Sequence, residues 1–150
     1  MKTLAQIAVC LTVAVAASGC LGYESGRTPT SPSGSTGSLL GNWASSNLIP
    51  TPSSCADFKW NITEQTGNTA KGSFSASCAG DLKLIGTAEG SISGSTIAWT
   101  AEATGNAPGL SNCRVTLRGT AEIGVTAVRV PYSGDTCLGP VSGVESLSRR

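Results

Sequence analysis

The stretch Ala56-Asp57-Phe58-Lys59-Trp60-Asn61-Ile62-Thr63 alternates apolar and polar residues without a break. The same alternation returns in CRVTLRGTAE, residues 113–122, and from Ile97 through Ala103. A period of two residues places one face of a strand in the core and the other in water. No stretch combines apolar residues at the spacing of a helix with residues that would cap the ends of a helix. The chain is therefore predicted to be all-β and built from half-buried antiparallel strands.

The links between these stretches predict the topology. Short glycine-bearing links at 66–68, 93–95 and 123–124 are typical of tight hairpins. Longer connections are expected at residues 45–54, 79–81, 103–112 and 133–136. The resulting strands are 39–45, 56–66, 69–78, 82–92, 95–103, 113–123, 125–132 and 137–147. About eight such strands in an up-and-down order can close into an antiparallel barrel without an exposed edge. A β-sandwich is the alternative.

The first 19 residues have the features of a secretory signal peptide. Lys2 precedes an apolar run from Leu4 to Ala17, which is too short for a membrane span of ~20 residues. The sequence Ala17-Ser18-Gly19-Cys20 resembles a bacterial lipoprotein signal, and this resemblance implies that Cys20 receives the lipid. Ordinary cleavage after Ala14-Val15-Ala16 is the alternative, and it would give a secreted protein with Cys20 as a plain thiol.

The cysteine count favours lipidation. Cys10 lies in the leader and is lost in either case, so acylation of Cys20 leaves an even set of four. Such cysteines form disulfides in an oxidising compartment. A hairpin turning at Gly67 brings Cys55 near Cys78, and a hairpin turning at Gly124 brings Cys113 near the loop that leads into Cys137. We therefore predict the disulfides Cys55–Cys78 and Cys113–Cys137, both at the end of the barrel where the longer connections gather.

Composition defines the remaining organisation. Residues 20–38 hold Cys20 and a linker rich in Gly, Ser, Thr and Pro, and residues 39–150 form the barrel domain. The net charge of +1 without a basic patch argues against nucleic acid as a partner. A location in the cell envelope, anchored by lipid, is expected. By the resemblance to lipoproteins, Leu21 in place of an aspartate favours the outer membrane.

No catalytic chemistry is predicted. The chain contains no histidine, which removes the usual general base and the commonest metal ligand. The carboxylates of the patterned strands fall mostly on outward positions, and these are Asp57, Glu64, Glu89, Glu102 and Glu122. We therefore expect no enzyme activity, no metal site and no cofactor.

The motif Gly41-Asn42-Trp43 opens the first expected strand. With the long link after it and the meander that follows, it resembles the first strand of the calycin group, which includes lipocalins and avidins. The resemblance implies that Trp43 closes one end of the barrel and that an arginine of the final strand, Arg149 or Arg150, lies over it.

Two binding functions remain open. Phe58, Trp60, Phe74, Trp99 and Tyr132 face inward and could line a cavity for a small apolar ligand, or they could fill the core. Alternatively, the loops at residues 47–52 and 106–110 expose apolar residues and proline at one end, where they could contact another envelope protein. Small exported inhibitors of lysozyme and of proteases are similar in build.

Overall fold

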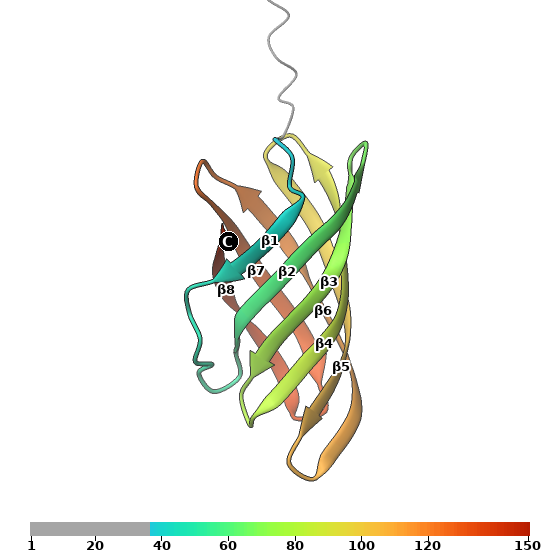
Figure 1. Ribbon diagram of the computed structural model, residues 1–150. Helices are drawn as coiled ribbons and strands as arrows, with labels where there is room; N and C mark the ends of the chain where they lie inside the picture. Colours follow the sequence, from blue (N-terminus) through green and yellow to red (C-terminus); the bar gives the residue numbers. More distant parts are fainter. Residues whose placement is uncertain (1–36) are drawn as a thin grey trace, which may run out of the picture. The chain divides into compact units, whose positions relative to one another are not determined.

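The computed structural model describes residues 37–150. The predicted signal peptide, Cys20 and the linker up to residue 36 lie outside the described residues. Residues 37–150 form eight antiparallel strands, each paired with its neighbour in sequence, and β8 returns to pair with β1 (Figure 1). The strands are β1 (Gly41–Ser45), β2 (Cys55–Thr66), β3 (Thr69–Cys78), β4 (Leu82–Ser93), β5 (Thr96–Ala107), β6 (Leu110–Ile123), β7 (Ala127–Thr136) and β8 (Gly139–Arg149). The predicted closed barrel is confirmed. Among residues 37–150 there is no helix that is long and apolar enough to cross a membrane.

Both predicted disulfides are present. Cys55 and Cys78 are register partners where β2 begins and β3 ends, and they form one bridge. Cys113 near the start of β6 is bridged to Cys137, which follows β7. All four cysteines lie at one end of the barrel, together with the β1–β2, β3–β4, β5–β6 and β7–β8 connections, and we call this the disulfide end. Disulfides of this kind indicate an oxidising compartment.

Two of the long connections predicted at the disulfide end are wrong in detail. Residues 103–112 are mostly strand, because β5 continues to Ala107 and pairs with Leu110 across a two-residue turn at Pro108-Gly109. A register shift between Gly105 and Ala107 interrupts the alternation, which explains why the sequence pattern ended too early. Figure 1 shows this hairpin reaching furthest at the lower end. Residues 133–136 likewise belong to β7.

As a result, the loop of residues 46–54 is the one connection longer than three residues within the described part of the chain. It follows a short strand, since β1 has 5 residues whereas β2 has 12 and β8 has 11. Along the lower half of β2 and β8 the loop therefore takes the place of a longer β1 (Figure 1).

Small residues on the inward face allow close approach of neighbouring strands. A Cβ atom on Gly72 would lie 1.9 Å from the carbonyl oxygen of Asn61, and one on Gly86 would lie 2.0 Å from that of Glu102. At these positions the neighbouring backbone leaves no room for a side chain, so only glycine fits. The glycines therefore serve close contact between strands.

Candidate functional site

The five aromatic residues predicted to face inward meet in the core. All five are buried, on β2, β3, β5 and β7. The ring of Phe58 lies edge-on to Phe74, with 5.3 Å between centroids, and 4.9 Å from the ring of Tyr132. Phe74 in turn lies 6.4 Å from Trp99. The sequence therefore identified the aromatic core correctly.

These rings fill the interior and do not enclose a ligand cavity. Two voids beside Trp60 have volumes of about 10 Å³ each, which is close to the space that one water molecule needs. Pockets for small organic ligands are typically ~300–1,000 Å³. The indole N–H groups of Trp60 and Trp99 find no hydrogen-bond partner among the described residues, so packing alone holds these rings. Of the two alternatives for the interior, the filled core is observed.

Trp43 is partly buried and packs against the core in the half of the barrel away from the disulfides. Its indole N–H donates to the carbonyl oxygen of Leu39 at 2.7 Å. The guanidinium of Arg149, its register partner on β8, lies 4.9 Å from the ring centroid of Trp43. The arginine expected over this tryptophan is therefore present, and it is Arg149 rather than Arg150.

At the disulfide end the structure adds a residue that the sequence pattern missed. Glu145 on β8 is only 4% exposed, although it is a carboxylate in an otherwise apolar inward row with Val141 and Leu147. Its Oε1 accepts a hydrogen bond of 3.0 Å from the side-chain amide of Asn47. Among the described residues no lysine or arginine forms an ion pair with Glu145. The alternation of inward and outward residues along β8 could have predicted that Glu145 faces inward. Gly139-Pro140 and Gly143 obscured this pattern in the sequence.

Tyr132 lies close to this carboxylate. Its hydroxyl donates to the carbonyl oxygen of Cys55 and accepts from the Cys55 N–H, both at 2.6 Å. Burial raises the pKa of the Tyr132 phenol above its ordinary value of 10.0; the Cys55 hydrogen bond opposes this change, and the nearby charge of Glu145 adds to it. The phenol is therefore a neutral structural group at physiological pH.

The 46–54 loop is fastened on both sides. The Asn47 carbonyl oxygen accepts hydrogen bonds from the Asp57 N–H at 2.8 Å and the Ser45 hydroxyl at 3.0 Å. At the other side, the Ser53 carbonyl accepts from the Ser142 N–H of β8 at 3.0 Å. Between these attachments Leu48 is 63% exposed and Ile49 is 78% exposed. A fixed backbone thus presents two large apolar side chains to solvent.

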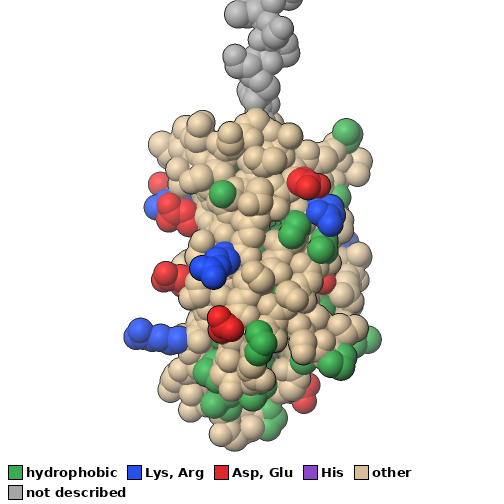
Figure 2. Space-filling model, turned by 180° about the vertical axis from the view of Figure 1, so that it is seen from behind, with side chains coloured by type: hydrophobic (Ala, Val, Ile, Leu, Met, Phe, Trp, Pro, Cys, Tyr) green, Lys and Arg blue, Asp and Glu red, His purple; other side chains and the backbone are tan. Residues whose placement is uncertain are grey.

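The disulfide end exposes further apolar residues. Leu138 in the β7–β8 turn is 54% exposed, and Pro52 is also exposed. We use the word rim for Leu48, Ile49, Pro50, Pro52 and Leu138. Figure 2, which shows the barrel from behind, has hydrophobic side chains gathered toward the same lower end, whereas charged side chains are scattered along the wall.

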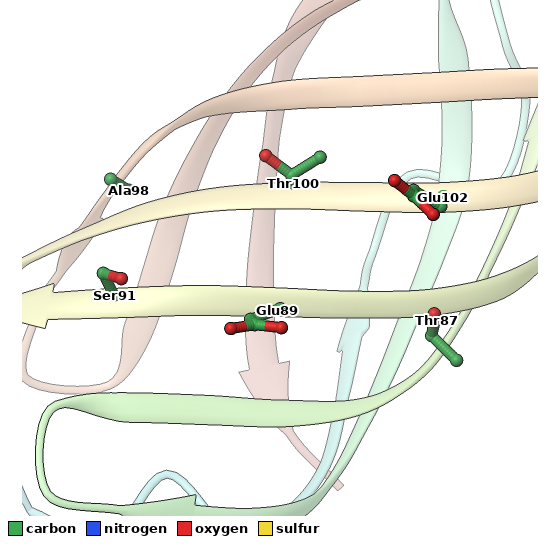
Figure 3. Close-up of a pocket in the computed structure, with 6 residues that line it drawn as sticks. All are labelled: Thr87, Glu89, Ser91, Ala98, Thr100 and Glu102. Carbon is green, nitrogen blue, oxygen red and sulfur yellow. The ribbon is translucent and has the colours of Figure 1, made fainter.

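The outer wall of β4 and β5 carries a shallow polar depression, drawn in Figure 3. It is lined by Thr87, Glu89, Ser91, Ala98, Thr100 and Glu102, whose side chains project from the outer faces of the two strands. Glu89 forms an ion pair of 3.1 Å with Lys71, and both side chains are solvent-exposed. Glu64, Glu89, Glu102 and Glu122 are all exposed, as predicted. This depression is therefore ordinary solvent-exposed strand surface.

Comparison with known proteins finds no matching family model, no similar curated sequence and no similar solved structure.

Proposed function

We propose that this protein is an exported, non-enzymatic binding module, anchored by lipid at Cys20, that contacts a protein partner of the bacterial cell envelope through its rim. The observation that carries the proposal is the fixed loop that exposes Leu48 and Ile49. Leu48 and Ile49 are adjacent and lie in one loop with Pro50 and Pro52, and grouped apolar side chains of this kind, unlike single exposed ones, mark interfaces. The filled interior directs the proposal to this surface rather than to a small apolar ligand inside the barrel.

The shape of the loop specifies the kind of partner. Ile49 precedes Pro50 and Thr51 precedes Pro52, and a residue before proline is restricted to extended conformations. The rim therefore offers apolar side chains on a backbone that is already ordered, so association loses little conformational entropy. A groove lined by apolar side chains in a folded protein complements such a segment. Inhibition of an envelope enzyme, such as a lysozyme or a protease, is one way in which this contact would act.

The N-terminal sequence supports the location. A leader followed by Cys20 and a linker would place the domain at a membrane surface, and Leu21 favours the outer membrane. The two disulfides agree with an oxidising compartment. The rim lies opposite the end at which the linker joins the barrel, so it would be free to meet a partner.

We also infer that the barrel has a lipocalin-like architecture. The support is the eight-stranded meander together with Trp43, which lies under Arg149. In this protein the architecture would serve as a scaffold for the rim, because the interior is filled.

The test is photo-crosslinking in the cells that produce the protein. A photoreactive side chain replaces Ile49 in one variant and Val125 in another; Val125 is a fully exposed apolar residue in the β6–β7 turn at the opposite end. We expect one discrete protein adduct from position 49 and none from position 125. The adduct partner, once purified, should bind the wild-type protein and should bind the Leu48→Asp variant much more weakly. Equal adducts from both positions, or none from position 49, would overturn the proposal.

A further inference from the structure

We propose that Glu145 is a positioning residue that keeps the rim loop in its presented conformation by holding Asn47. The inference rests on the proposed function of the rim, and it assigns a role to the one buried carboxylate among the described residues. Glu145 does not itself reach the partner surface, because only 4% of it is exposed.

The cost of burying Glu145 indicates that it has a role. A carboxylate in an apolar row loses much of its hydration, and such groups are usually paired with a cation or with several donors. Here the Asn47 side-chain amide is the hydrogen-bond donor to Glu145, at 3.0 Å, and no cation is paired with it among the described residues. The bond fixes the side chain of Asn47 at the point where the chain leaves β1.

Asn47 transmits this restraint to the loop. Its carbonyl oxygen accepts from the Asp57 N–H and from Ser45, and its Oδ1 accepts from the Ile49 N–H at 3.4 Å. Without the contact to Glu145, the loop would keep the bonds to the Asn47 carbonyl, the attachment of Ser53 to Ser142 and the turn that Thr51 forms with Ser54, but the side chain of Asn47 would lose its anchor. Leu48 and Ile49 follow Asn47 directly, so we expect the loss of this anchor to loosen them.

The experiment measures amide hydrogen exchange at the two ends of the loop by NMR, on the isotope-labelled barrel in the full chain. The reporters are the N–H groups of Asp57 and Ser142, whose acceptors are loop carbonyl oxygens. The test variant is Asn47→Ala, which removes an exposed side chain and with it the donor to Glu145. The matched control is Asn61→Ala, an exposed asparagine of β2 whose side chain makes no hydrogen bond to the described residues. Glu145→Gln keeps an oxygen acceptor for Asn47 at the same position.

We expect exchange at Asp57 and Ser142 to become up to about tenfold faster in Asn47→Ala, as the loss of one hydrogen bond that anchors the loop implies. Glu145→Gln and Asn61→Ala should stay within about twofold of wild type, and amides of β4 and β5 should not change in any variant. Unchanged exchange in Asn47→Ala, equal acceleration across the whole barrel, or acceleration in Glu145→Gln would each overturn the inference.

This result is independent of the crosslinking experiment. If position 49 gives no adduct but Asn47→Ala releases the loop, the proposed function fails and the positioning role stands. If the adduct forms but Asn47→Ala leaves the loop ordered, the proposed function stands and the positioning role of Glu145 fails. When both proposals are correct, Asn47→Ala also lowers the yield of the adduct at position 49.

Discussion

Tyr132 joins two parts of the chain that lie 77 residues apart in sequence. Its phenol satisfies both the N–H and the carbonyl of Cys55 at the start of β2, inside the barrel and next to the first disulfide. Its ring also packs against Phe58. One side chain thus supplies apolar contact and two hydrogen bonds to a buried backbone segment. Because β1 does not pair with β2 at Cys55, this segment would otherwise have no partner on that side.

Replacement of Tyr132 by phenylalanine should therefore be costly. Tyr132→Phe keeps the ring but leaves the buried N–H and carbonyl of Cys55 without this partner. We expect the free energy of unfolding to fall by ~1–3 kcal/mol, as measured by urea denaturation. Tyr23→Phe, in the predicted linker, is the matched control and should leave the stability unchanged. Equal stability of both variants would show that these hydrogen bonds contribute nothing.

The raised pKa of Tyr132 predicts that the stability of the barrel decreases at alkaline pH. Because the folded-state pKa of Tyr132 is raised above its ordinary value of 10.0, the unfolded state loses this proton first as pH rises. The stability contribution is fully present below pH 10.0 and decreases above it, toward the raised folded-state pKa. Chemical denaturation of wild type and Tyr132→Phe, from below pH 10.0 upward, measures this contribution to stability. The difference between the two proteins should shrink with rising pH, and a constant difference would contradict the assignment.

At the scale of elements, alternation predicted most of the barrel. β2, β3 and β4 fall within one residue of their predicted bounds, and register alone gave both disulfide partners. The pattern failed where a second constraint interrupts it. The shift near Gly105 hid the end of β5, and Gly143 hid the inward position of Glu145. The contact of Glu145 with Asn47 spans 98 residues, and local pattern contains no information about such a pair.

The close contact of Gly72 with β2 yields a further prediction. In Gly72→Ala the new methyl group would meet the carbonyl oxygen of Asn61 at 1.9 Å, so β2 or β3 must move. We expect a loss of stability of ~1–3 kcal/mol, by analogy with overpacked cores. Ser73→Ala, the next residue on the solvent face, should cost less than ~1 kcal/mol. Thermal unfolding of the two variants compares them directly, and similar midpoints would contradict this role of Gly72.

At the scale of the whole molecule, the barrel has a filled interior. Two indoles, two phenyl rings and Tyr132 occupy the space that a ligand would need. Long-chain fatty acids and naphthalene-based fluorescent probes should therefore cause no saturable change in tryptophan fluorescence. Saturable binding at one molecule per barrel, with a change in the emission of Trp60 or Trp99, would show that the interior opens to ligands.

The claim on which the proposed function depends is that the barrel is exported and held at a membrane through Cys20. Intact mass spectrometry of the protein from a bacterial membrane fraction, with and without reduction, tests it most directly. We predict a chain that begins at Cys20, carries a diacylglycerol and an acyl chain, and gains four hydrogens when Cys55–Cys78 and Cys113–Cys137 are reduced. A soluble chain that begins near Ala17 without lipid would contradict the anchor.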